Sequence, residues 1–320
     1  MTRRIHRGVA AAGAGLVLAL VGAAGAVASG WIDVGVRQES RLARHADAVY
    51  GGIGRPLAGT APTVAFAKGR DSVALASGLR VERVLAGETS GAPTAKLAQN
   101  ADQIALWPRD TDPQWAILCI EDGTTAPGIQ RLKLRGPGKG RVETLLTGTA
   151  GCDGIRRTPW NTILATEETG DGWALELYDP IGTTGVAFDR TTGALTGADA
   201  GNVHPRPALG RFAWEGLHVL ADGTVFAGDE LRPSGGRNGG ALFTFVSSQQ
   251  PGTLDASRRA LLADPANAAR SPLAAGALYA LRVGDGSSYG QGNQTGRGTW
   301  VGPLADVGGL TGGVGNARLE

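Results

Sequence analysis

Residues 115–123 read Trp-Ala-Ile-Leu-Cys-Ile-Glu-Asp-Gly, an apolar run of six residues that ends in two acids and a glycine. An apolar run this short, bounded by turn formers, is typical of a buried β-strand. Asp-Gly is favoured in tight hairpin turns, where both central residues adopt positive φ. Residues 130–134, Gln-Arg-Leu-Lys-Leu, then alternate between polar and apolar side chains, as a half-buried strand does. This stretch predicts strands joined by short acidic turns.

The same unit recurs over most of the chain. Short apolar or alternating runs occupy residues 104–107, 115–120, 130–134, 162–166, 173–178, 217–220, 224–227, 241–246 and 277–283. Asp-Gly pairs lie between or beside them at 122–123, 153–154, 171–172, 222–223 and 285–286. Glycine makes up 52 of the 320 residues, which agrees with a chain dense in turns. We predict one helix, Asp255 to Leu262, and an all-β fold: a sandwich, a barrel or, favoured by the repeated strand and acidic turn, a propeller.

The N-terminus resembles an export signal. Arg3, Arg4 and Arg7 precede an uncharged stretch, residues 8–30, which contains the small-residue sequence Ala26-Val-Ala28. This order is typical of a secretory signal peptide, and the paired arginines resemble a twin-arginine signal. We therefore predict a signal peptide at 1–28, a linker or strap at 29–70 and the propeller at 71–320, with a periplasmic or secreted protein. The alternative is an uncleaved membrane anchor, because the uncharged stretch is long enough to span a bilayer.

The charge balance argues against a nucleic-acid-binding protein. The chain has 31 Lys and Arg against 29 Asp and Glu, and the removal of three leader arginines leaves 28 against 29. No Lys/Arg-rich run or interleaving of basic and aromatic residues follows the leader. The nucleophile-elbow, phosphate-loop and paired-cysteine motifs are absent as well.

Cys119 and Cys152 are the only cysteines. A disulfide between them is one interpretation in an oxidising compartment. The alternative is that the two cysteines are not paired. Cys119 would then be a small buried hydrophobic residue, because it lies inside an apolar run. Cys152 lies among turn formers and is expected in a loop.

Carboxylates recur where short apolar strands end. They are Glu121, Glu167 with Glu168, Glu215, and Asp229 with Glu230. In a propeller such strand ends converge on a central channel, where the carboxylates would repel one another unless cations intervened. Oxygen-rich sites suit hard ions such as Ca²⁺ or Mg²⁺. The alternative is that each acid is an ordinary solvated turn residue.

Four motifs in order resemble the PhoX-type alkaline phosphatases. Residues 100–108, 115–123 and 127–131 resemble the opening blade of that family. Cys152, Thr-Pro-Trp-Asn-Thr at 158–162 and Thr-Glu-Glu at 166–168 resemble its Cys, Thr-Pro-Trp-Gly-Thr and Glu-Glu stretch. Gly-Arg-Phe-Ala-Trp-Glu at 210–215 is similar to its Gly-Arg-Phe-x-His-Glu segment, and Gly-Asp-Glu at 228–230 to its Gly-Asp-Asp.

This resemblance implies an exported six-bladed β-propeller that hydrolyses phosphate esters of small molecules at a cluster of Fe³⁺ and Ca²⁺ ions. By motif position Cys152 would be an iron ligand. The carboxylate ligands would be Glu121, Glu168, Glu215 and Asp229, with Glu167 and Glu230 as further candidates. Arg211 would bind the phosphate oxygens. A monomer is expected.

The sequence also departs from the family pattern. Asn161 replaces a glycine, and Trp214 replaces a histidine. The chain ends at Glu320, where the family pattern would continue into an Arg-Pro-Glu-Asp segment, so we expect a propeller that is incomplete at its C-terminus. Two alternatives follow: a catalytically silent envelope propeller that binds calcium and acts as an interaction module, and a calcium-dependent lactonase or similar hydrolase.

Overall fold

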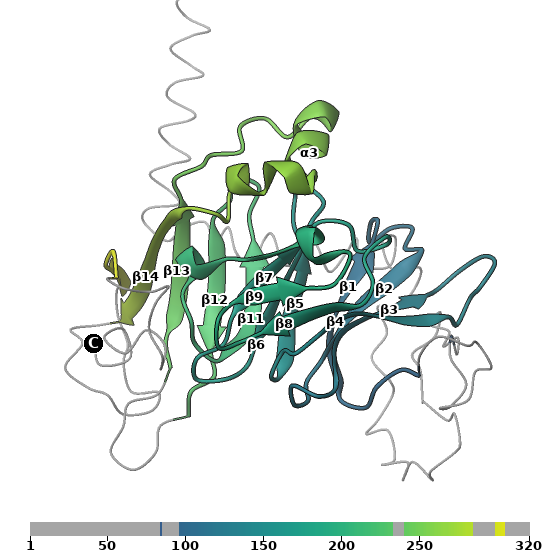
Figure 1. The fold of residues 1–320 in the computed structure, drawn as a ribbon. Helices are drawn as coiled ribbons and strands as arrows, with labels where there is room; N and C mark the ends of the chain where they lie inside the picture. The colour runs from purple at the N-terminus through teal and green to yellow at the C-terminus, as the bar shows by residue number, and fades with distance from the viewer. Residues whose placement is uncertain (1–83, 85–95, 233–239, 284–297, 305–320) are drawn as a thin grey trace, which may run out of the picture. The chain divides into compact units, whose positions relative to one another are not determined.

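The regular secondary structure in the described part of the chain consists mainly of antiparallel β-strands (Figure 1). The computed structural model describes Val84 and residues 96–232, 240–283 and 298–304, all within the second of the chain's two units, Val84–Glu320. The predicted signal peptide at 1–28 and strap at 29–70, together with the Asp285-Gly286 turn, lie outside the described residues. Within the described residues, no helix is long and apolar enough to cross a membrane.

Three sheets make up this fold. The first has the strand order β1-β2-β3-β4-β8-β9, the second β10-β7-β6-β5 and the third β11-β12-β13-β14-β15. Neighbouring strands are antiparallel throughout, apart from the parallel pair β4 and β8. The strands are β1 (Ala101–Trp107), β2 (Trp115–Ile120), β3 (Pro127–Lys133), β4 (Val142–Thr147), β5 (Cys152–Arg157), β6 (Ile163–Glu167), β7 (Ala174–Leu177), β8 (Val186–Asp189), β9 (Ala194–Thr196), β10 (Val203–Pro205), β11 (Trp214–Val219), β12 (Val225–Asp229), β13 (Leu242–Ser247), β14 (Gly276–Val283) and β15 (Gly298–Val301).

The three sheets are related as blades of a propeller-like fold. In each sheet the first strand along the chain, β1, β5 or β11, lies at one edge. These first strands pack beside one another, β5 against both β1 and β11. Apolar side chains of successive sheets fill the spaces between them: one core joins the first and second sheets, and another joins the second and third. The all-β prediction is confirmed; the described residues include three sheets, and the count of six blades remains a prediction.

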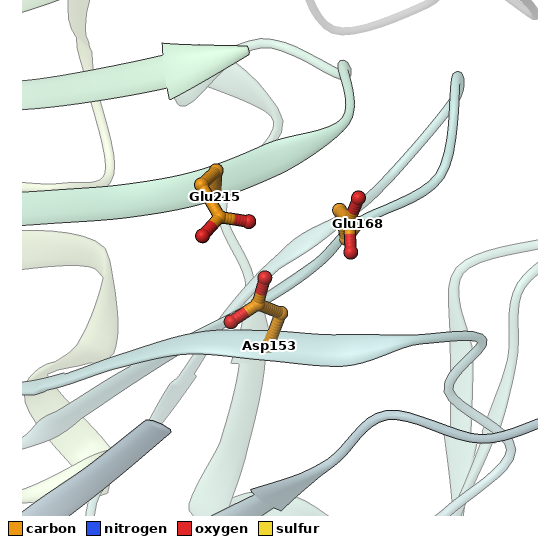
Figure 2. A group of neighbouring side chains, drawn as sticks. All are labelled: Asp153, Glu168 and Glu215. Carbon is orange, nitrogen blue, oxygen red and sulfur yellow. The ribbon is translucent and has the colours of Figure 1, made fainter. Parts of the chain in front are cut away.

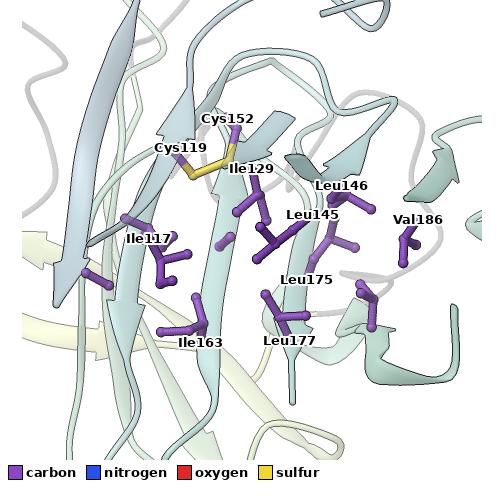
Figure 3. Close-up of a cluster of buried hydrophobic side chains, with 14 of the residues drawn as sticks. Ile117, Cys119, Ile129, Leu145, Leu146, Cys152, Ile163, Leu175, Leu177 and Val186 are labelled. Carbon is purple, nitrogen blue, oxygen red and sulfur yellow. A yellow bond between two sulfur atoms is a disulfide. The ribbon is translucent and has the colours of Figure 1, made fainter. Parts of the chain in front are cut away.

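The core between the first and second sheets includes a disulfide (Figure 3). Cys119 of β2 and Cys152 of β5 are bonded, with their Cα atoms 4.9 Å apart. Ile117, Ile129 and Ile163 lie in the same fully buried cluster. The disulfide interpretation is therefore correct, and the loop environment predicted for Cys152 is wrong, because this residue is the first of a buried strand.

Short helices complete the described part of the fold. The predicted helix is confirmed as α3 (Ala256–Leu262), whose N-cap Asp255 accepts a hydrogen bond from the backbone N–H of Arg258. The 3₁₀ helix η4 (Pro265–Arg270) follows it, and two more, η2 (Ala200–Asn202) and η3 (Pro207–Leu209), flank β10.

Most predicted strands are present, but one Asp-Gly pair has another role. Asp222-Gly223 forms the expected tight turn between β11 and β12, with Gly223 at φ 89°. Asp153-Gly154, predicted as a turn, instead lies inside β5, where Asp153 is 2% exposed. The error arises because a buried aspartate within a strand runs against ordinary strand composition.

Candidate metal centre

Three carboxylates from two sheets come together at the N-terminal ends of the first strands (Figure 2). Asp153 belongs to β5, Glu215 to β11, and Glu168 follows directly after β6. Oxygen atoms of the three side chains all lie within 4.8 Å of one another. Uncompensated carboxylates at this spacing repel one another, so the arrangement fits a bound cation.

A repeated irregularity of the backbone orients Asp153 and Glu215, two of these acids, together with Asp102. Register shifts occur between Ala101 and Ile104 in β1, between Cys152 and Ile155 in β5, and between Trp214 and Leu217 in β11. Each shifted segment includes one acid: Asp102, Asp153 and Glu215 respectively. β-Bulges re-aim side chains and are common beside functional sites. An acid therefore lies at the same kind of register shift in each of the three first strands.

A glycine allows β11 to approach β5 closely at this point. A Cβ atom on Gly154 would overlap Thr166 Oγ1 and would lie 2.7 Å from the backbone oxygen of Glu215. Such distances are shorter than van der Waals contact, so any other residue would push the two strands apart. Gly154 thus brings Glu215 next to Asp153.

Backbone hydrogen bonds tie the segments that carry the acids. The N–H of Gly151 donates to Asp122 O, and the N–H of Glu168 donates to Gly151 O at 2.7 Å. Glu168 also forms a β-bridge with Ala213, whose carbonyl accepts from the N–H of Glu230. These hydrogen bonds link the first sheet to the third. Main-chain contacts therefore fix the relative positions of the segments that carry the acids.

The electrostatics of the group favour a cation. Burial, with Glu215 and Asp102 nearby, raises the pKa of Asp153 to about 9. Burial and the neighbouring acids Glu230, Glu121 and Glu215 raise the pKa of Glu168 to about 8. Asp153 is almost fully buried, and its Oδ1 has no hydrogen-bond partner among the described residues. A buried, unpartnered carboxylate oxygen is costly, and a cation would satisfy it.

Four of the predicted ligands lie at or beside this group. Glu168 and Glu215 are members of it. Glu230 interacts with both and pairs with Arg232, and its pKa is lowered by its hydrogen bond with Glu168 and by Arg232. Glu121 is exposed and lies close enough to raise the pKa of Glu168.

The structure places other predicted site residues in structural roles. The fully buried carboxylate of Glu167 accepts hydrogen bonds from Arg190 and from the N–H of Ala150, so it faces away from Glu168. Asp229 Oδ1 accepts hydrogen bonds from the N–H groups of Ala213 and Leu231.

Arg211 and Cys152 are also engaged elsewhere. The Arg211 guanidinium bonds to Asp171 and lies 4.2 Å from the centre of the Trp173 ring. The prediction of Cys152 as an iron ligand is corrected: its sulfur is bonded to Cys119, and a disulfide sulfur cannot act as a thiolate ligand.

Sequence reasoning missed Asp153 and Asp102. A short sequence pattern at the start of each first strand could have identified them. In this pattern an apolar residue is followed by an acid, then by Gln or Gly, and then by a second apolar residue. It reads Ala-Asp-Gln-Ile in β1, Cys-Asp-Gly-Ile in β5 and Trp-Glu-Gly-Leu in β11.

Comparisons with known proteins add little to this geometry. No family model matches the chain. A search of curated proteins also gives no match. Among solved structures, the chain is similar to PhoX of Pseudomonas fluorescens in complex with vanadate, a transition state analogue, at 17% identity and a TM-score of 0.38. The similarity covers 65% of this chain and 49% of that one, so the chain spans about half the length of PhoX.

The cation-free protein should lose stability as the pH rises. Asp153 and Glu168 have folded-state pKa values of about 9 and about 8, far above their usual values of 3.8 and 4.5. A raised pKa means that the folded state binds protons more tightly than the unfolded state does. The protonated carboxyls therefore contribute their full stabilisation of the fold below about pH 4, and this stabilisation is lost as the pH approaches 8–9. We expect Tm, measured by calorimetry without divalent cations, to fall over this range and Asp153→Asn to flatten the fall. An unchanged pH profile in that variant would contradict the account.

Proposed function

We propose that the protein is an exported, metal-dependent phosphatase that hydrolyses esters of phosphorylated small molecules at Asp153, Glu168 and Glu215. The observation that carries the proposal is the convergence of these carboxylates around the unpartnered Oδ1 of Asp153. The sequence resemblance to PhoX-type phosphatases supplies the reaction class.

The residues fit a hard cation. Three carboxylates, with Glu230 and Asp102 nearby, offer the oxygen ligands that Ca²⁺ prefers. Ca²⁺ is therefore the proposed ion. Fe³⁺ would have to bind through carboxylates alone, because Cys152 is in the disulfide. A bound cation would neutralise the phosphate oxygens and hold the ester in place for hydrolysis.

The protein's own residues would orient that site. The backbone hydrogen bonds of Gly151, Glu168 and Ala213 fix the relative positions of the segments that carry the acids. Glu230, next to Arg232, remains ionised more readily than an isolated glutamate, because these neighbours lower its pKa. Its charge lies beside the cluster, where it can add a ligand oxygen for the cation.

Export of the protein rests on separate support. The leader sequence predicts secretion, and the disulfide between Cys119 and Cys152 agrees with an oxidising compartment. We therefore propose that the mature protein acts in the periplasm or outside the cell.

A direct assay tests the proposed activity. Purified protein should hydrolyse p-nitrophenyl phosphate with Ca²⁺ present and lose this activity on chelation. Glu168→Gln removes one ligand charge and should lower kcat/KM by about 100-fold or more, since even residues outside the ligand shell change metal sites by 10–100-fold. Asp222→Asn, in the exposed β11–β12 turn, is the matched control and should retain activity. Full activity in Glu168→Gln would refute the proposal.

A second function has specific support. Cys152 and Arg211, which the phosphatase resemblance assigns to iron and to phosphate, are engaged by Cys119 and by Asp171. This favours a catalytically silent propeller that binds calcium and contacts a partner. It predicts a Ca²⁺-dependent increase in Tm that Glu168→Gln reduces, with no turnover of phosphate esters.

A further inference from the structure

The same three strands that present acids at one end carry arginines and apolar residues toward the other. A cavity of about 310 Å³ lies there, and its walls include Ile104 and Leu106 of β1, Arg156 and Arg157 of β5, and His218 and Val219 of β11. Arg156 follows Asp153 by three residues, and His218 follows Glu215 by three. At about 3.3 Å per residue, the cavity lies roughly 10 Å along the strands from the acids.

Arg156 is the first reason to expect an anion in this cavity. Its Nη1 donates to Gln103 Oε1 and to the backbone oxygen of Ile155, both at 2.7 Å. These two bonds orient the guanidinium, while Nε and Nη2 have no partner among the described residues. No carboxylate in that part of the chain pairs with it. A half-buried guanidinium with free donors and no counter-charge is well suited to a carboxylate, phosphonate or phosphate group.

Arg157 adds a second positive charge. Its Nε donates to the backbone oxygen of Leu106 at 3.3 Å, and its Nη2 lies 3.2 Å from Asp110 Oδ2. The Asp110 side chain is 73% exposed, so this ion pair is weak and leaves the cavity positive. The remaining walls include the apolar side chains of Ile104, Leu106 and Val219.

We propose that this cavity binds a small organic anion, with its charged group on Arg156 and Arg157 and its apolar part against Ile104, Leu106 and Val219. The volume suits a ligand of small-molecule size, and few charged groups among apolar walls are typical of ligand pockets. The site is separate from the acid cluster, and the inference does not depend on the proposed function.

Phenylphosphonate is a suitable probe, because it combines a charged group with an apolar ring and has no ester to hydrolyse. Calorimetric titration of the full chain, stripped of divalent cations and transferred to chelator-free buffer, separates this site from the metal centre. We expect saturable binding that is tighter than binding of inorganic phosphate, because phosphate has no apolar part. Equal affinity for both probes, or no binding, would overturn the proposal.

Variants locate the binding. Arg156→Gln and Arg157→Gln should each weaken phenylphosphonate binding by about tenfold, the value of a hydrogen bond to a charged group. Ile104→Glu places a negative charge in the cavity at a residue that is 51% exposed, so it should abolish binding and leave the fold intact. Arg135→Gln, which removes an exposed arginine paired with Asp112 outside the cavity, is the control. Wild-type affinity in the folded Ile104→Glu or Arg156→Gln protein would refute the assignment.

Discussion

Replacement of Glu176 by glutamine is expected to lower the free energy of unfolding by about 3–5 kcal/mol, the cost of breaking a buried ion pair. Glu176 is fully buried and lies 2.6 Å from Arg206, which is itself buried. The substitution keeps the size and shape of the side chain but leaves the Arg206 charge without its partner. Against a typical total of 5–15 kcal/mol, this loss is large.

Glu176 is the centre of a hydrogen-bond network, so its replacement should destabilise more than its own strand. Its Oε1 accepts hydrogen bonds from Trp160 Nε1 and Thr162 Oγ1, and its Oε2 accepts from Ser271 Oγ at 2.7 Å. Arg206 also donates to the backbone oxygen of Ala268, in η4. The network therefore fastens the second sheet to the segment between β13 and β14 of the third.

Urea unfolding measures this prediction. Arg135→Gln, which breaks an exposed pair with Asp112, is the matched control and should change stability by less than about 1 kcal/mol. The double variant Glu176→Gln/Arg206→Met should be less destabilised than the sum of its single variants, because it leaves no buried charge. A Glu176→Gln protein as stable as the wild type would show that the pair contributes little.

Replacement of Asp153 by asparagine should weaken Ca²⁺ binding by about 100-fold or more. Asp153 is the most buried member of the acid group, and its Oδ1 has no hydrogen-bond partner within the described ranges. Residues that only support metal ligands contribute 10–100-fold to affinity, so the loss of a ligand charge should cost at least as much. Asparagine preserves the volume of the side chain and one of its oxygen atoms. The change in Ca²⁺ affinity therefore measures the contribution of the carboxylate charge rather than that of packing.

Calorimetric Ca²⁺ titrations of wild type, Asp153→Asn and Asp222→Asn measure the loss. Asp222 is an exposed aspartate in a turn, and its replacement by asparagine should leave the Ca²⁺ affinity unchanged. In wild-type protein, binding should also release protons, because the pKa values of Asp153 and Glu168 exceed 7 in the cation-free state. Equal affinities in the three proteins would place the cation elsewhere.

The strands were predictable where sequence periodicity is strong. Residues 115–120 and 241–246 combine apolar runs with flanking turn formers, and they correspond to β2 and β13. β5 was missed because two of its buried residues, Asp153 and Gly154, are ordinary turn residues. Their burial depends on the approach of β11, which comes from a distant part of the chain.

The site was predictable in outline only. The acids expected at strand ends predicted convergence, and Glu168 and Glu215 do converge, although Glu215 is the second residue of β11 rather than the end of a strand. Glu167 could not be separated from Glu168 by residue type. Successive side chains of a strand point to opposite faces, so Glu167 meets Arg190 while Glu168 meets the other acids. The pairing of Cys119 with Cys152, 33 residues apart, likewise depends on packing between sheets.

A crystal structure of the protein grown with Ca²⁺ tests the central claim most directly. The account predicts an ion bound by oxygen atoms of Asp153, Glu168 and Glu215, at the 2.3–2.6 Å distances usual for calcium. The same three carboxylates without an ion, in protein saturated with Ca²⁺, would contradict it.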